Sequence, residues 1–172
     1  MSKAFTKEDD AGDALVPRLV SPLPPGARNY LTPDGAARLR AELVRLADEE
    51  RPGLLATTGE TGHRSAEAQE RLQHVEQRIT YLEQSLRTAE VTPPPAPPHD
   101  TVRFGAAVRV RDARGQDMLY RIVGVDEADA SRDEVSWLAP IAQALLGAKL
   151  GQRVPFRFPA GMTQLEIREI SY

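Results

Sequence analysis

The sequence predicts an α+β protein in which an antiparallel helical hairpin precedes a small antiparallel sheet domain with one helix. From Ala68 to Ala89, apolar residues recur at alternating intervals of four and three, which is typical of a helix packed lengthwise against another helix. A proline-rich run at 93–98 then ends the helical pattern, and short runs of alternating polarity typical of strands follow it. We expect four segments: a disordered leader at 1–28, a coiled-coil hairpin at 29–91, a linker at 92–101 and the sheet domain at 102–172.

The leader carries an acidic cluster at 8–13 and a proline-rich stretch at 21–26, with little that could be buried, so we expect it to be disordered. It lacks the apolar core of a secretory signal. The longest apolar run without charge, at 138–148, is too short to span a bilayer. These features predict a cytoplasmic protein without a membrane segment.

The first helix of the hairpin is predicted over residues 33–56. Thr32 can cap its N-terminus, and a proline follows at the first helical position. An N–H at this position has no acceptor within the helix, so proline costs no hydrogen bond there. Pro52 and Gly53 interrupt the helical pattern, so we expect a kink near them. The apolar seam of this helix consists of three leucines: Leu39, Leu43 and Leu46.

The second helix is predicted to begin after Ser65, a suitable N-cap, and to end near Val91. A polar stretch from Thr57 to Ala66 separates the two helices and forms the tip of the hairpin. Each helix alone would expose an apolar stripe, and packing the two stripes together buries both. The seam positions are Ala68, Leu72, Val75, Ile79, Leu82, Leu86 and Ala89.

Beyond the prolines, apolar and polar residues alternate in short runs bounded by turn residues, which indicates strands. The run from 139 to 146 is typical of a short helix, with Pro140 in its first turn and Gly147 at its end. Together these elements predict a small antiparallel sheet crossed by one helix. The expected strands are 107–111, 117–125, 134–137, 154–158 and 164–170.

The composition excludes several classes of function. A net charge of −3 gives no bulk positive charge for tight binding to free DNA or RNA, and the absence of cysteine excludes disulfides and thiolate metal sites. The sequence also lacks the motifs of phosphate-binding loops, nucleophile elbows and zinc peptidases. His63, His74 and His99 lie in the tip, on a helix and in the linker, so they predict no metal site.

Two carboxylates flank the tip and are the candidates for chemistry there. Glu60 and Glu67 lie on either side of His63 and Arg64, and one or two carboxylates with several waters commonly hold Mg²⁺. A bound Mg²⁺ could activate water for phosphodiester cleavage. The alternative is that these residues keep a turn solvated, with Glu67 complementing the positive end of the second helix.

Six short segments match the landmarks of one bacterial family in the right order: Ser-Lys-Ala-Phe-Thr-Lys-Glu-Asp-Asp at 2–10, Asn-Tyr-Leu-Thr-Pro at 29–33, Glu-Glu-Arg-Pro at 49–52, Tyr-Arg-Ile-Val-Gly at 120–124, Ala-Leu-Leu at 144–146 and Pro-Ala-Gly at 159–161. With the helical hairpin, the linker and the sheet domain, they resemble the Gre transcript-cleavage factors, most closely the GreB-like members. The resemblance covers nearly the whole chain. Several matches in order are more specific than any one of them.

The resemblance implies an FKBP-like fold for the sheet domain, which in the family docks at the rim of the secondary channel of RNA polymerase. The hairpin enters this channel, and two carboxylates at its tip help to hold the second Mg²⁺ with which the polymerase hydrolyses backtracked RNA. The polymerase performs the catalysis. The chain is therefore expected to be no enzyme, to act as a monomer and to carry no cofactor of its own.

The tip departs from the family pattern where the carboxylates should stand. His63 occupies the aspartate position and Ala66 the glutamate position, while Glu67 is displaced by one residue, about 100° of rotation on a helix. A methyl group cannot bind Mg²⁺, and histidine suits so hard a cation poorly. Stimulation of transcript cleavage is therefore predicted to be weak or absent. The tip residues compared are Glu60, Gly62, His63, Arg64, Ser65, Ala66 and Glu67.

The chain also departs from the family pattern in two other regions, one that contacts RNA and one that docks on the polymerase. The second helix is nearly charge-neutral over 70–78, where GreB-like members carry a basic patch that meets emerging RNA. In the predicted docking segment, leucine occupies the place of an acidic residue two positions before the proline. This segment consists of Trp137, Leu138, Ala139 and Pro140. The sequence leaves contact with backtracked RNA, and the affinity for polymerase, open.

The sequence is compatible with four functions. The first is a secondary-channel regulator of RNA polymerase that lacks the cleavage carboxylates and modulates initiation or pausing, or excludes authentic Gre factors. The second is a working cleavage factor with the relocated ligands Glu60 and Glu67. The third is a coiled-coil scaffold for a partner other than polymerase. The fourth is a prolyl isomerase, which an aromatic content of 5% disfavours.

Overall fold

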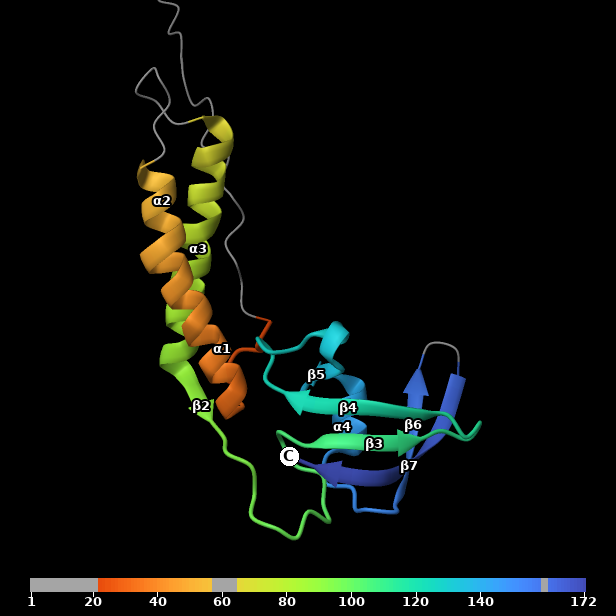
Figure 1. The fold of residues 1–172 in the computed structure, drawn as a ribbon. Helices are drawn as coiled ribbons and strands as arrows, with labels where there is room; N and C mark the ends of the chain where they lie inside the picture. Colours follow the sequence, from red (N-terminus) through yellow and green to blue (C-terminus); the bar gives the residue numbers. More distant parts are fainter. Residues whose placement is uncertain (1–21, 57–64, 159–160) are drawn as a thin grey trace, which may run out of the picture.

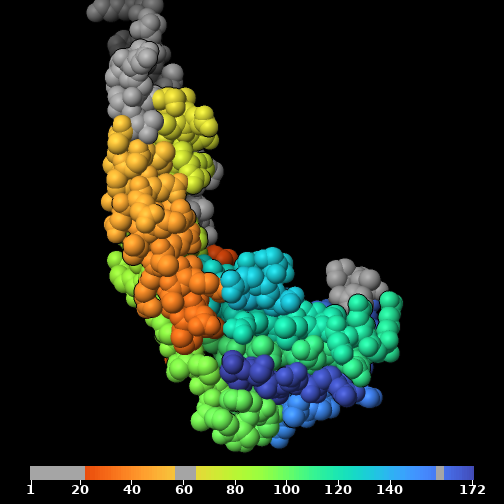
Figure 2. All heavy atoms as spheres, in the orientation of Figure 1, coloured from red at the N-terminus to blue at the C-terminus, as the bar shows by residue number. Residues whose placement is uncertain are grey.

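The computed structural model describes residues 22–56, 65–158 and 161–172, and it confirms the predicted α+β class. An elongated arm of two helical halves stands on a small domain built around a sheet (Figure 1, Figure 2). Most of the predicted leader, and residues 57–64 of the predicted tip, lie outside the described residues. None of the described helices is long and apolar enough to cross a bilayer.

The first half of the arm is one strand followed by three consecutive helical segments. Thr32 caps the first helix as predicted, because its hydroxyl oxygen accepts the N–H of Gly35 at 3.0 Å. The segments are β1 (Asn29–Leu31), α1 (Pro33–Val44), the π-helical stretch η1 (Arg45–Glu50) and α2 (Arg51–Ala56).

The π-helical stretch η1 explains how the helix continues past Pro52, where the sequence predicts a kink. A proline has no N–H, and in an α-helix its ring clashes with the carbonyl four residues earlier. In η1 the bonding pattern is wider, and the N–H of Arg51 donates to the carbonyl of Leu46, five residues back. The interruption predicted at Pro52 therefore takes the form of a π-helical turn.

The second half of the arm is helix α3 (Ala66–Thr88), which begins at the predicted cap. The hydroxyl of Ser65 accepts the N–H of Ala68 at 3.2 Å. The prediction that this helix reaches Val91 is wrong, because Ala89–Val91 forms strand β2. Strand β2 pairs in parallel with β1, and this pairing closes the base of the arm.

The two halves of the arm run antiparallel. Arg78 binds Glu42 through hydrogen bonds of 2.8 and 2.9 Å, whereas Arg71, earlier in α3, binds Glu50, later in the first half. The apolar residues of the two halves gather into one cluster along the arm. The buried seam residues are Leu39, Leu46, Leu72, Val75, Ile79 and Leu82.

The second domain is a five-stranded sheet in the order β5-β4-β3-β7-β6, with one helix packed against it. Its elements are β3 (Ala107–Arg111), β4 (Asp117–Val123), the 3₁₀ turn η2 (Ala130–Arg132), β5 (Glu134–Ser136), α4 (Pro140–Leu145), β6 (Arg153–Phe158) and β7 (Gly161–Ser171). The prediction of a wholly antiparallel sheet is wrong at one edge, where β5 pairs in parallel with β4. Alternating polarity identifies a strand but not the direction of its partner. The connection at 124–133 leads the chain back from the end of β4, so that β5 runs in the same direction as β4.

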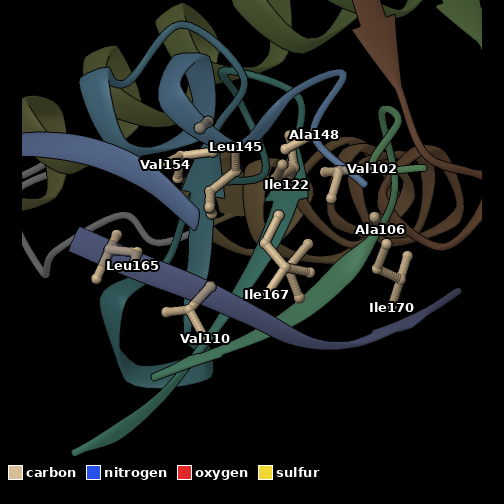
Figure 3. Close-up of a cluster of buried hydrophobic side chains, with 12 residues drawn as sticks. Val102, Ala106, Val110, Ile122, Leu145, Ala148, Val154, Leu165, Ile167 and Ile170 are labelled. Atoms are coloured by element: carbon tan, nitrogen blue, oxygen red, sulfur yellow. The ribbon is translucent and has the colours of Figure 1, made fainter. Parts of the chain in front are cut away.

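The sheet domain has its own hydrophobic core between the sheet and α4 (Figure 3). Ile122 of β4, Ile167 of β7 and Leu145 of α4 are fully buried in it. The arm has a separate core that includes Leu31 and Leu82, and within the described chain the two clusters share no residue. The chain thus contains two packed units that meet at the base of the arm.

Candidate functional site

The tip is described from Ser65 onward. Ser65 caps α3, Ala66 is the first residue of the helix, and Glu67 lies exposed in the first turn. A carboxylate at this position complements the partial positive charge of the helix N-terminus. Four predicted tip residues lie outside the described part of the chain: Glu60, Gly62, His63 and Arg64. A pairing of Glu67 with another tip carboxylate stays a prediction.

Among the residues that the structure describes, no group of three or more His, Asp or Glu side chains is placed to hold a metal ion. His74 lies on α3, where its Nε2 is 3.9 Å from Glu70. His99 packs against the ring of Tyr172, with 4.7 Å between the ring centroids. The two described histidines therefore belong to different parts of the molecule.

The predicted docking segment forms a turn between β5 and α4. The N–H of Ala139 donates to the carbonyl of Ser136 at 2.8 Å, and the side-chain amide of Gln143 donates to the carbonyl of Trp137 at 2.6 Å. Pro140 is exposed at the start of α4, where a backbone N–H would have no acceptor within the helix, so proline costs no hydrogen bond. The turn is held from both sides, while its proline end is open to solvent.

The other end of this segment packs inward. Leu138 and Trp137 are half-buried, and the ring of Trp137 lies edge-on to Tyr30 of β1, with 5.6 Å between centroids and an interplanar angle of 71°. Tyr30 also packs against Phe104 at 5.6 Å. Such aromatic pairs contribute about 0.5–1.5 kcal/mol beyond the area they bury. One aromatic cluster thus joins the docking segment to the base of the arm.

A buried carboxylate, Glu127, lies where the sheet domain meets the first helix. This residue is 5% exposed and belongs to the connection between β4 and β5. Its Oε2 accepts the N–H of Thr32 at 3.0 Å and the N–H of Gly124 at 2.7 Å, and its Oε1 accepts the hydroxyl of Thr32. The carboxylate therefore faces the N-terminus of α1, where the helix dipole stabilises a negative charge.

The neighbouring carboxylate, Asp126, binds the other half of the arm. It accepts hydrogen bonds from the hydroxyls of Tyr81 and Ser85, both on α3. The amide of Asn29, in β1, donates to the Ser85 hydroxyl at 3.2 Å and to the Ser85 carbonyl at 2.9 Å. Strand β1, helix α3 and the connection after β4 are thus joined by one chain of hydrogen bonds.

A third carboxylate, Glu134 at the start of β5, holds α1 directly. Its two oxygens accept from the guanidinium of Arg38 at 3.0 Å each, and the Nε of Arg132 lies 3.4 Å from Oε1. Hydrogen bonding to Glu134, whose side chain is 5% exposed, raises the pKa of Arg38 above its ordinary value, so this guanidinium stays charged. A bidentate pair of this kind fixes orientation as well as distance.

A polar groove of about 480 Å³ runs beside these contacts, between the arm and the connection at 124–133. Three arginines line it, and each already binds a carboxylate: Arg38 and Arg132 bind Glu134, and Arg78 binds Glu42. A small anion would have to displace these partners. The groove therefore indicates a packed joint rather than a ligand site.

Sequence reasoning missed this joint, because Asp126 and Glu127 resemble an ordinary exposed acidic run. Two glycines carry a signal that could have indicated it. A Cβ at Gly35 would lie 1.6 Å from Oε1 of Glu127, and one at Gly124 would lie 2.2 Å from the carbonyl oxygen of Tyr30. A glycine inside a helix costs about 1 kcal/mol relative to alanine, so its presence in the first turn of α1 points to a close approach there.

Known proteins similar to this chain span most of its length. The sequence model of a family described as "Transcription elongation factor, GreA/GreB, C-term" matches residues 97–172. The transcription elongation factor GreB of Neisseria meningitidis serogroup A is 32% identical over 154 residues, which cover 84% of this chain and 94% of that protein. The transcription elongation factor GreA of Rhodospirillum rubrum is 36% identical over 151 residues, which cover 83% and 96%. Among solved structures, a prokaryotic transcription elongation factor GreA/GreB from Nitrosomonas europaea aligns with a TM-score of 0.41 at 24% identity, covering 84% of this chain and 100% of that one.

Proposed function

Because the chain belongs to the GreA/GreB family of transcription elongation factors, we propose that it binds RNA polymerase at the secondary channel and regulates transcription there. The arm would enter the channel as an antiparallel coiled coil. The sheet domain, as an FKBP-like domain, would dock at the rim of the channel. The exposed Pro140, at the end of a turn held by Ser136 and Gln143, supports docking through this segment.

We further propose that the chain stimulates transcript cleavage weakly or not at all. The observation that carries this proposal is the place of Ala66 as the first residue of α3, next to the Ser65 cap. If Ala66 occupies the glutamate position of the family, as the resemblance implies, that position holds a methyl group in the first turn of α3. Glu67 is rotated from that position by about 100°. A methyl group offers no ligand to Mg²⁺.

The chain would then be no enzyme, and any Mg²⁺ involved would belong to the polymerase. It would occupy the channel as a monomer, change pausing or initiation, and exclude authentic Gre factors. Contact with backtracked RNA is expected to be weak, because the charges over 70–78 of α3 nearly balance.

A second candidate is a working cleavage factor with relocated carboxylates. One observation favours it, since Glu67 is exposed in the first turn of α3, at the end of the described arm. Its counterpart would be Glu60, on the other side of the tip. No comparable observation favours a scaffold for a partner other than polymerase.

Binding and cleavage can be measured separately on halted, backtracked elongation complexes. We expect the chain to bind core RNA polymerase and to displace an authentic GreB from the complex, while the RNA shortens no faster than without a factor. Cleavage at the rate given by GreB would refute the inactive tip, and absence of binding would refute the polymerase partner. Loss of a residual cleavage activity in Glu60→Ala and Glu67→Ala would favour the relocated carboxylates.

A further inference from the structure

We propose that Asp126, Glu127 and Glu134 form a carboxylate clasp that sets the angle between the arm and the sheet domain. All three residues belong to one stretch of chain, between the end of β4 and the start of β5. Their partners lie on both halves of the arm, since Glu127 and Glu134 bind α1 or its cap and Asp126 binds α3. In Figure 2 the cyan β4–β5 segment lies directly against the base of the arm.

The core of the arm and that of the sheet domain share no described residue, and the apolar contacts between the two units lie at the base of the arm, at Tyr30 and Leu31. Tyr30, which packs on Phe104 and Trp137, lies in β1 at the very base of the arm. A contact there can act as a pivot. Within the carboxylate clasp, Glu127 binds the cap of α1, whereas Glu134 binds α1 itself and Asp126 binds α3. The contacts with the helices restrain rotation about that pivot.

The directions of the hydrogen bonds at Glu127 favour a carboxylate over an amide. The oxygen of the Thr32 hydroxyl accepts the Gly35 N–H, so the hydroxyl proton is directed to Oε1 of Glu127. Oε2 accepts two backbone N–H groups at the same time. A carboxylate accepts from all three donors. A glutamine whose carbonyl keeps the two backbone N–H groups turns its NH₂ toward the Thr32 hydroxyl, which can accept from it only by turning its own proton away. Glu127→Gln therefore removes the acceptor of the Thr32 hydroxyl proton with little change of shape.

The positions of the attachment points explain why they can fix an orientation. Thr32 and Arg38 lie at the cap and in the second turn of α1, and Ser85 lies in the last turn of α3. Because α1 and α3 pack against each other, holding both prevents the arm from rotating about the axis of either helix. Two carboxylates on the connection and one at the start of β5 thus restrain the whole arm.

The arm is long, so a small change of angle at the carboxylate clasp becomes a large displacement at the tip. From Ser85 to Ala66, α3 spans about 28 Å at 1.5 Å per residue. A tilt of about 10° at the clasp would therefore move Ala66 by about 5 Å. The consequence for polymerase rests on the proposed function: groups that act in an active site must be placed to within about 1 Å.

The test measures the angle in the free protein. The chain contains no cysteine, so spin labels can be attached through Glu70→Cys on α3 and Lys149→Cys in the sheet domain, both at exposed positions. Pulsed electron paramagnetic resonance then gives the distribution of distances between the labels. Residue 70 lies about 22 Å from Ser85 along α3, so a tilt of about 10° moves it by about 4 Å. Asp126→Asn combined with Glu127→Gln is expected to broaden or shift this distribution by up to about 4 Å. The matched control, Glu83→Gln, neutralises an exposed carboxylate on α3 and should leave the distribution unchanged.

An unchanged distribution in the double variant would overturn the proposal. If the double variant loses helical circular dichroism, Asp126→Asn alone decides, because it leaves the contact of Glu127 with Thr32 in place. Its distribution must then broaden or shift, and an unchanged one overturns the proposal equally. No polymerase is present in this measurement, so its outcome is separate from that of the binding and cleavage experiments.

Discussion

Glu127 binds Thr32 twice, at the backbone N–H and at the hydroxyl, although 95 residues separate them in the sequence. Thr32 is also the cap of α1. The cap of α1 therefore has these two hydrogen bonds only when the sheet domain is packed against it. The end of α1 and the sheet domain are thus linked directly through Thr32.

Gly35→Ala is expected to destabilise the protein, although alanine is the better helix former by about 1 kcal/mol. The new Cβ would lie 1.6 Å from Oε1 of Glu127, so the carboxylate must leave the cap, and each buried group left unpaired costs about 1–3 kcal/mol. The matched control is Gly53→Ala in α2, where a Cβ meets nothing within 4 Å and a gain of up to about 1 kcal/mol is expected. Urea unfolding measures both variants, and equal stabilisation by the two alanines would contradict the close contact.

Leu82→Ala is expected to lower the free energy of unfolding of the arm by about 2–5 kcal/mol, because Leu82 is fully buried in the seam. Val44→Ala, at a residue that is 55% exposed, is the control and should stay within about 0.5 kcal/mol. Since the sheet domain has its own core, β3 and β7 should keep their hydrogen-exchange protection in Leu82→Ala. Loss of that protection would mean that the two units unfold together.

The arm is expected to lose stability in acid through Glu50. Hydrogen bonds from Arg71, with a smaller contribution from Arg45, lower the pKa of this carboxyl in the folded protein. A lowered folded pKa gives stability that is fully present above the unfolded value of about 4.3 and is lost as the pH falls through the folded value. Glu50→Gln should therefore flatten the fall of the unfolding free energy between about pH 5 and pH 3. Unfolding curves at constant ionic strength test this, and the same slope in both proteins would count against the assignment.

Restoring the carboxylates of the family should create cleavage activity. His63→Asp combined with Ala66→Glu places acidic residues at both positions for which the resemblance to the family implies carboxylates. Carboxylate oxygens are ligands that Mg²⁺ prefers, so we expect the cleavage rate of backtracked RNA to rise by roughly tenfold or more. Glu67→Gln alone is the control and should change nothing if the natural tip is inactive. A restored variant that binds polymerase but cleaves no faster would show that the missing carboxylates are not the cause.

Leu138→Asp is expected to tighten binding to RNA polymerase. Leu138 lies two residues before the exposed Pro140, at the position for which the resemblance to the family implies an acidic residue. One added charge pair at a surface is worth up to about 1 kcal/mol, or about fivefold in affinity. Ala113→Asp adds the same charge in the exposed turn between β3 and β4 and serves as the control. Equal gains in competition with GreB would assign the effect to net charge instead of the docking segment.

The elements that could be predicted from the sequence are those with a local signal. The alternating polarity at 107–111 predicts the bounds of β3, because successive side chains of a strand point to opposite faces of the sheet. The caps at Thr32 and Ser65 were also predictable, since a capping side chain bonds to an N–H only three residues away. The seam of α3 follows in the same way from its own spacing.

What could not be predicted depends on residues far along the chain. Ala89–Val91 continues the helical pattern locally, but its pairing with Asn29–Leu31 decides its conformation. The parallel direction of Glu134–Ser136 depends on the path of the connection before it. Glu127 becomes a buried acceptor only through Thr32 and Gly124, and nothing in its neighbours distinguishes it from a solvated acid. Tertiary contacts override local preference at each of these places.

Strands β1 and β2 bring the entry and the exit of the arm side by side. The contacts between β1 and β2 do not depend on the number of helical turns between them and the tip of the arm. Adding one heptad to each half would keep the seam in register and lengthen the projection by about 10 Å. Its reach can therefore vary during evolution in steps of two turns, while the domain that anchors it stays the same.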